Sequence, residues 1–212
     1  MLVTIEANTS SKLRQLAAWA KYFHYMDRTQ LIDLATNPQR KVKNINVRLS
    51  SILFLRESGY ATNAEVEKLF NLVKDEKDFP IWVDAKSIIV KEVTGEKDHE
   101  DLPYKQKLKR NIEENVAMLR SEAALMIAEF GQRTMAYKKI KPEFITTLKE
   151  ILDRIATDPI FVDQRTHKTS SYFNGFLKAL YLADRRAAVP YMTNYGINLS
   201  DLFPPYPGNA AK

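Results

Sequence analysis

YKQKLKRNIEENVAMLRSEAALMIAEFGQRTMAYKKI, residues 104–140, is the stretch that decides the fold. Its apolar side chains recur at the spacing of one helix face, which does not suit a strand. Pro103 precedes the pattern, where its missing N–H does no harm. The second half, AALMIAEF, is apolar on nearly every side, and a helix of that kind is surrounded by its neighbours. We therefore predict a central helix over about 104–138 in an all-α domain. The periodic positions are Leu108, Ile112, Val116, Leu119, Ala123, Met126 and Phe130.

The bulk composition is that of an ordinary globular chain. Its 212 residues are 45% hydrophobic and 27% charged, which suits a single helical domain over 1–212. No apolar run is long enough to cross a bilayer, and MLVTIEANTSSK lacks the profile of a signal peptide, so we expect no membrane partner. The lack of cysteine excludes disulfides and thiolate metal sites. We expect a cytoplasmic protein, or a virion component if its source is viral.

About six helices are expected to form a bundle around 104–138. Caps and apolar periodicity place the others at 11–26, 28–36, 45–58, 64–75, 142–157 and 171–189. Pro142 is expected to open one of them, and Pro190 to follow the end of another. A small β-hairpin is predicted near 80–93, although 84–93 also suits a helix. The other parts are an N-terminal arm (1–9), the hairpin and an acidic loop (79–102), and a Pro/Tyr-rich C-terminal tail (191–212).

Motifs for metal, nucleotide or triad chemistry are missing from the sequence. His24, His99 and His167 lie in unrelated segments with no ligand spacing between them. The six glycines are too far apart for a phosphate-binding loop, and there is no GxSxG turn. We therefore expect no metal site, no cofactor and a non-enzymatic role.

One short segment, IWVDAK at 81–86, resembles the second half of the PD-(D/E)xK nuclease motif. The resemblance implies that Asp84 would hold Mg²⁺ and that Lys86 would position or activate water. The motif also needs an acid on a preceding strand, a role left here to Asp75 or Asp78. The simpler interpretation is a solvated turn, and an Mg²⁺-dependent nuclease is the third hypothesis.

Charge is segregated along the chain. Residues 1–58 carry nine Lys/Arg against four Asp/Glu, residues 59–102 six against eleven, and residues 130–190 eleven against six. Such segregation suits a polyanion-binding face, or complementary patches that join identical subunits. The turn between 35 and 45 is too long for a helix-turn-helix, so reading of base sequence in the major groove is not expected.

Five basic clusters are the candidate nucleic-acid contacts. Cations oppose the macrodipole at the start of the central helix, so a cluster there is easier to explain if a polyanion offsets it. Neighbouring tyrosines, among them Tyr137 and Tyr172, could stack on unpaired bases; the alternative is that they belong to the core. The candidates are Arg40, Lys41, Lys43 and Arg48; Lys105, Lys107, Lys109 and Arg110; Lys138, Lys139 and Lys141; Arg165 and Lys168; and Arg185 and Arg186.

Two functions from different classes follow from these patterns. The leading hypothesis is a non-enzymatic protein that binds the backbone of RNA or DNA with low sequence specificity. The alternative is a self-assembling structural subunit, of the coat, nucleoprotein or complex-assembly type, whose basic and acidic faces meet between copies. Under either hypothesis we expect a homo-oligomer or a subunit of a larger assembly.

Overall fold

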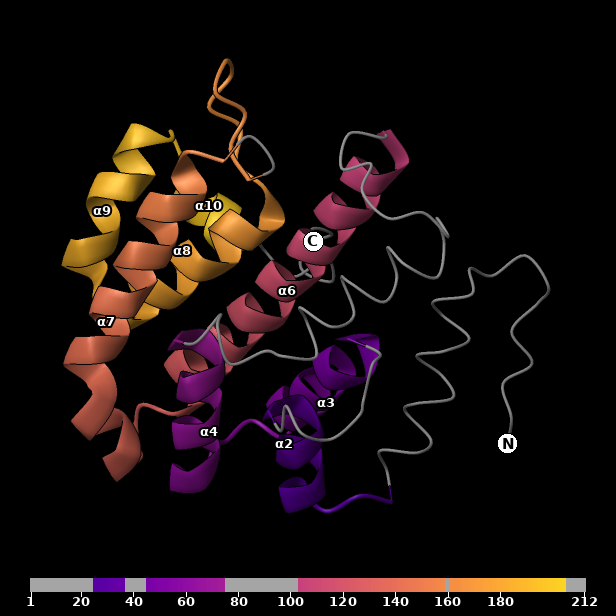
Figure 1. Ribbon diagram of the computed structural model, residues 1–212. Helices are drawn as coiled ribbons and strands as arrows, with labels where there is room; N and C mark the ends of the chain where they lie inside the picture. Colours follow the sequence, from indigo (N-terminus) through magenta and orange to yellow (C-terminus); the bar gives the residue numbers. More distant parts are fainter. Residues whose placement is uncertain (1–24, 37–44, 75–102, 159–160, 205–212) are drawn as a thin grey trace, which may run out of the picture.

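The computed structural model describes residues 25–36, 45–74, 103–158 and 161–204, and these ranges are mostly helical (Figure 1). For residues 45–46 and 103–115 it describes the backbone alone. The described ranges contain no strand, only an isolated bridge between Val162 and Thr169. The all-α prediction is confirmed. The helices are α2 (Arg28–Thr36), α3 (Ile45–Glu57), α4 (Asn63–Lys74), α6 (Pro103–Phe130), α7 (Met135–Ala156), α8 (Ser171–Ala183), α9 (Arg185–Asn194) and α10 (Leu199–Leu202).

The α6 helix lies between two groups of helices, with α2, α3 and α4 on one side and α7 to α10 on the other (Figure 1). It packs directly against α3, α4 and α8. Each side chain from 123 to 128 is at most 6% exposed, so this part of α6 is covered on all sides. Full burial of Met126 and Ile127 contributes about 1.5–3 kcal/mol each to folding.

The α2, α3 and α4 helices match their predicted bounds closely because their ends carry local signals. Asp27 caps α2, since its carboxylate accepts from the Gln30 amide at 2.8 Å and the Gln30 side chain accepts from the Asp27 amide. Gly59 follows α3 with a φ of 73°, a left-handed conformation that glycine adopts without strain. Thr62 and Glu65 form the same reciprocal cap at the start of α4.

The end predicted for the central helix is wrong. The α6 helix ends at Phe130, not at about 138, and α7 begins at Met135. In the turn between them the Thr134 amide donates to the Gly131 carbonyl at 2.8 Å, and the Thr134 hydroxyl then caps α7 by accepting from the Tyr137 amide. The lysines at 138, 139 and 141 therefore belong to a second helix.

Two prolines predicted at helix boundaries lie inside helices. Pro142 does not open a helix but sits within α7, and Pro190 sits within α9. Both side chains are exposed, so the carbonyl group that loses its amide partner lies on the solvent side of each helix.

The helix predicted over 171–189 is in fact two helices, α8 and α9. Asp184 separates them with an extended backbone (φ −154°), and its carboxylate accepts from the amides of Arg186 and Ala187 at 2.9 and 3.2 Å. The tail predicted from 191 begins with the last turn of α9 and continues into α10. Leu202 is buried against the core, so the tail packs on the domain as far as the structure describes it.

Several predicted features lie outside the described residues. They are the arm (1–9), the first helix up to residue 24, the basic segment QRKVKN at 39–44, the hairpin near 80–93 and the acidic loop that follows. Asp84 and Lys86, the nuclease-like pair, belong to this group.

A network of partly buried charges joins α3, α6 and α8. The Arg56 guanidinium of α3 pairs with Glu122 and Glu129, two turns apart on α6, and Lys178 of α8 lies 3.5 Å from Glu129. Burial raises the pKa of the Glu122 carboxyl, and the charge of Arg56 acts in the opposite direction. The pairing with Arg56 is therefore what keeps two carboxylates tolerable at this interface.

Gly131 is expected to tolerate no side chain. A Cβ atom there would lie 2.6 Å from the Ile127 carbonyl oxygen and 2.9 Å from Cγ2 of Val66. We expect Gly131→Ala to lower the free energy of unfolding by about 1–3 kcal/mol, measured by urea denaturation. An unchanged or higher urea midpoint would show that the α6–α7 turn can open, contrary to this packing.

Replacement of Arg56 should destabilise the protein in a pH-dependent manner. In Arg56→Met the pKa of the Glu122 carboxyl in the folded protein rises further. Below the pKa of unfolded Glu this carboxyl is protonated and costs no stability, and stability is then lost as pH rises through the folded pKa. We expect a loss of about 2–4 kcal/mol at pH 7, less than for fully buried pairs because these side chains are about one-fifth exposed. The loss should be smaller at pH 4. Equal losses at both pH values would contradict this account.

Candidate nucleic-acid interface

Three of the predicted lysines lie exposed in the first two turns of α7. Lys138, Lys139 and Lys141 all face solvent, and the first turn of this helix has no acidic residue. The amides nearest the helix start are already used, since Ala136 N–H donates to the Asn63 side chain at 2.9 Å and Tyr137 N–H donates to Thr134. An anion at this surface would therefore be held by the ammonium groups and not by the backbone.

Arg185 and Arg186 are the first two residues of α9, and both are exposed. Asp184 uses its carboxylate to cap the helix, which leaves the two guanidinium groups on the outer side of the α8–α9 junction. This helix also lacks an acidic residue in its first turn. The Asp184 carboxylate offsets part of the positive end of the α9 macrodipole, whereas the first turn of α7 has no carboxylate to do so.

One contact links the segments that precede these two groups of cations. The side chain of Gln132, in the α6–α7 turn, donates to the Leu182 carbonyl at 3.1 Å, so this turn lies beside the end of α8. Arg133, which the sequence analysis did not select, is exposed in the same turn. We call this set the basic end. It comprises Arg133, Lys138, Lys139, Lys141, Arg185 and Arg186.

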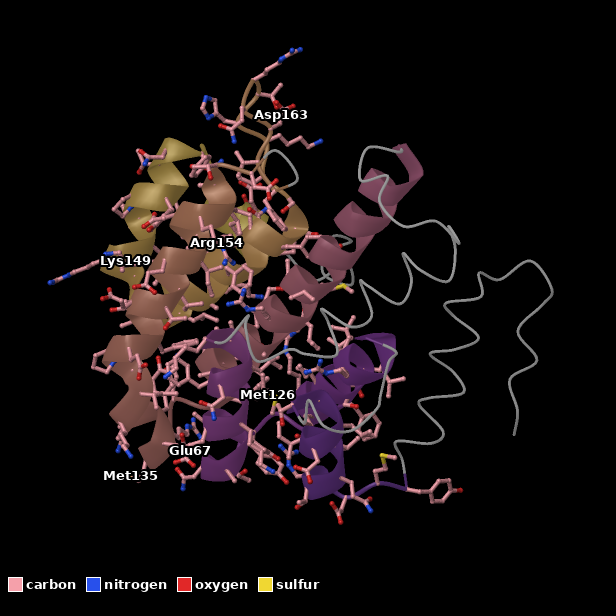
Figure 2. All side chains as sticks on the ribbon, in the orientation of Figure 1. Glu67, Met126, Met135, Lys149, Arg154 and Asp163 are labelled. Carbon is pink, nitrogen blue, oxygen red and sulfur yellow. The ribbon has the colours of Figure 1, made fainter. Side chains whose placement is uncertain are left out.

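Few carboxylates neutralise the basic end. Within the described part of the chain, none of its six cations forms an ion pair. Asn63 of α4 contacts the start of α7, and Figure 2 labels Glu67 of α4 in the same region of the view as Met135. Glu143 is already paired with Lys74 at 2.8 Å. The surface therefore keeps a clear positive excess.

Arg165 and Lys168 lie at the opposite end of α7, on the exposed loop 161–170. The helix has 22 residues, so about 33 Å separates its two ends. Asp163 shapes the loop by accepting from the amides of Arg165 and Thr166, and these hydrogen bonds lower the pKa of its carboxyl. The His167 ring lies 6.3 Å from that of Tyr195, just after α9. The two basic groups thus lie beyond opposite ends of α9.

Arg48 is not at the surface, contrary to its selection as a phosphate contact. It is 4% exposed, and its Nε donates to the Ala35 carbonyl at 2.8 Å, which ties α3 to the end of α2. Burial lowers its pKa to about 10. The sequence indicated that Arg48 is buried, because Arg48, Ile52 and Leu55 follow the spacing of one buried helix face.

The remaining candidates fall into two groups. Lys105, Lys107, Lys109 and Arg110 lie in the first turns of α6, and the structure describes only their backbone; Arg40, Lys41 and Lys43 lie outside the described residues. One candidate stacking residue belongs to the core, since Tyr137 is 4% exposed and its ring packs edge-on against Phe144.

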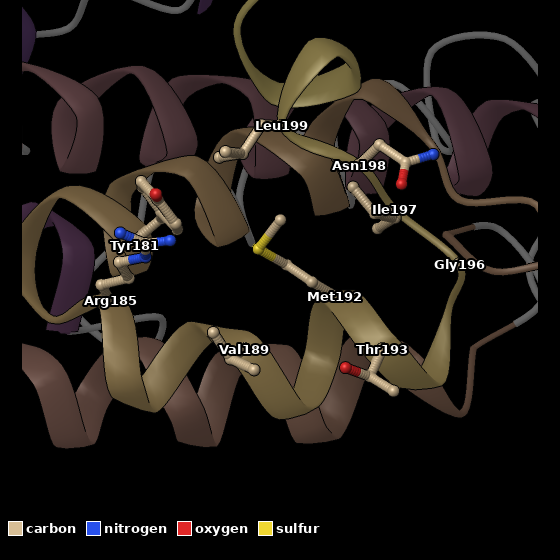
Figure 3. A pocket seen from close by; sticks show the side chains of 9 residues that line it. All are labelled: Tyr181, Arg185, Val189, Met192, Thr193, Gly196, Ile197, Asn198 and Leu199. Carbon is tan, nitrogen blue, oxygen red and sulfur yellow. The ribbon is translucent and has the colours of Figure 1, made fainter.

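Sequence reasoning did not find a pocket that lies between α9 and the segment 196–199. Its volume is about 460 Å³, and Figure 3 shows its lining side chains arranged around Met192. Three separate elements supply those side chains, so no local motif could have indicated it. They are Tyr181, Arg185, Val189, Met192, Thr193, Gly196, Ile197, Asn198 and Leu199.

Neither a metal cluster nor a membrane span occurs in the described part of the chain. No three His, Cys, Asp or Glu side chains there are grouped so that they could hold a metal ion. No helix in the same ranges is long and apolar enough to cross a bilayer. Comparison of the chain with protein-family models, curated proteins and solved structures finds no match.

Arg48 should matter for stability and not for anion binding. We expect Arg48→Leu to lower the free energy of unfolding by about 1–3 kcal/mol, since the Ala35 carbonyl loses a charged donor. The folded variant should bind a polyanion with unchanged salt dependence. If the Arg48→Leu variant is fully folded by circular dichroism but binds the polyanion with a weaker salt dependence than wild type, Arg48 would be a phosphate contact after all.

Proposed function

We propose that the protein is a non-enzymatic nucleic-acid-binding protein of low sequence specificity that contacts phosphates through the basic end. The observation that carries the proposal is the contact between Gln132 and Leu182. It holds the turn before α7 against the end of α8, and exposed cations follow in the first turns of both α7 and α9. Each cation that replaces a condensed counterion contributes to affinity without regard to base sequence.

The form of the basic end favours backbone contacts over base reading. Its cations extend from the ends of helices on flexible stems, and Lys binds phosphate as a point charge. Specific reading of duplex DNA requires a helix or ribbon placed in a groove with side chains at base edges. The expected ligand is therefore RNA or DNA of any sequence.

An assembly subunit remains the alternative because the same end carries exposed apolar side chains. Met135 is 69% exposed beside the lysines of α7, and Val189 is 46% exposed on α9. Contacts between copies would cover such side chains. Under this alternative the cations would meet acidic residues of a neighbour. Oligomerisation and location in the cytoplasm or a virion stay predictions, as does the nuclease hypothesis for Asp84 and Lys86.

The binding proposal is tested by fluorescence anisotropy of labelled single-stranded RNA, single-stranded DNA and duplex DNA at several salt concentrations. The test variant is Lys138→Gln/Lys139→Gln/Lys141→Gln, which removes three charges from exposed positions. For a single strand, loss of three phosphate contacts should reduce the slope of log affinity against log salt by about 2.

The matched control is Thr29→Glu/Gln30→Glu/Leu53→Glu, which changes the net charge equally at exposed positions of α2 and α3. Acidic residues in the first turn of α2 also suit its macrodipole, so folding should be retained. The control should keep the wild-type slope. Equal slopes for both variants, or no binding at low salt, would exclude the basic end as the binding surface. Size measurement by light scattering at micromolar concentration then tests the assembly alternative.

A further inference from the structure

The pocket beside α9 adjoins the basic end at Arg185. Figure 3 shows Tyr181 and Arg185 at one end of it, Val189 and Leu199 on opposite sides, and the Met192 thioether between them. Arg185 belongs both to the pocket lining and to the basic end. A molecule held by Arg185 therefore lies beside this pocket.

The pocket lining combines apolar and polar groups and carries one cation. Arg185 is the only charged side chain among the residues that line the pocket, and no lining side chain is acidic. The Tyr181 ring is fixed from behind by an edge-on contact with Phe203 at 5.7 Å, and the Arg185 guanidinium lies 5.8 Å from its centre. Thr193 and Asn198 add polar groups that could meet the edge of a ring.

We propose that this pocket takes an unpaired base of a single-stranded nucleic acid whose phosphates are held by the basic end. The inference rests on the proposed function and narrows its ligand from any nucleic acid to a single strand. A base offers flat apolar faces to Tyr181 and Met192, a polar edge to Asn198, and a linked phosphate to Arg185. Stacking of this kind tolerates any base sequence.

The shape of the pocket favours a base over a lipid chain. At about 460 Å³ it falls in the range of small-molecule sites. Its rim is open, since Val189 and Leu199 are 46% and 45% exposed. An acyl chain needs a site that covers it along its length, whereas a base linked to a backbone must enter and leave from one side. Bases of an intact duplex are paired and stacked, so they cannot enter.

The experiment uses three probes of equal length and the full chain. The probes are a single strand, the same strand with abasic sites, and a duplex, each titrated by anisotropy. The single strand should bind about tenfold more tightly than the abasic strand, which corresponds to one stacked base. Val189→Trp fills the pocket from its rim and should abolish this preference while the salt dependence stays. Leu53→Trp also replaces an aliphatic side chain with Trp, but at an exposed position of α3, and should leave the preference for the single strand intact.

The outcomes distinguish failure of the pocket inference from failure of the proposed nucleic-acid binding. Binding to no probe would overturn the proposed function and the pocket with it. Equal binding to single-stranded and abasic strands would overturn the pocket alone, as would a preference that survives Val189→Trp. Displacement of a fluorescent fatty acid from wild type but not from Val189→Trp, without any base preference, would assign the pocket to an anionic amphiphile and also overturn the inference.

Discussion

The structure depends on the complete burial of the second half of α6. Side chains from 123 to 128 have no solvent side, so α3, α4 and α8 must surround this segment before any of them has a stable position. The charges that border the segment, Glu122 and Glu129, are tolerated because Arg56 and Lys178 reach them from two of those helices. Gly131 then lets the chain leave the core in a turn too tight for a side chain. The position of α7, and hence of its lysines, follows from that turn.

The parts of the fold that could be predicted are those with local causes. Asp27, Gly59 and Thr62 mark helix ends through their own hydrogen bonds or φ, so the bounds of α2 to α4 could be inferred from the chain alone. The end of α6 was predicted too late, although the apolar periodicity stops at Phe130 and a glycine follows it; the break itself depends on the packing of Gly131 against Val66 of α4. The division of α8 from α9 likewise depends on the backbone of Asp184, which no periodicity indicates.

The candidate site was predictable in composition and not in arrangement. Exposure of Lys138, Lys139 and Lys141 follows from their place on the polar face of a helix. The position of these lysines relative to Arg185 and Arg186 depends on the Gln132–Leu182 contact between residues 50 apart. The loop with Arg165 and Lys168 follows the far end of α7. Arg48 was misassigned because its charge was weighed and its position on a buried helix face was not.

The central claim is that phosphates lie on the basic end, and lysine footprinting tests it most directly. The protein would be acetylated briefly with and without a saturating single strand at low salt, and the modification of each lysine measured by mass spectrometry. The account predicts protection of Lys138, Lys139 and Lys141, with Lys68, whose ion pair with Asp33 is retained, unchanged. Equal modification of the α7 lysines with and without the strand would contradict it.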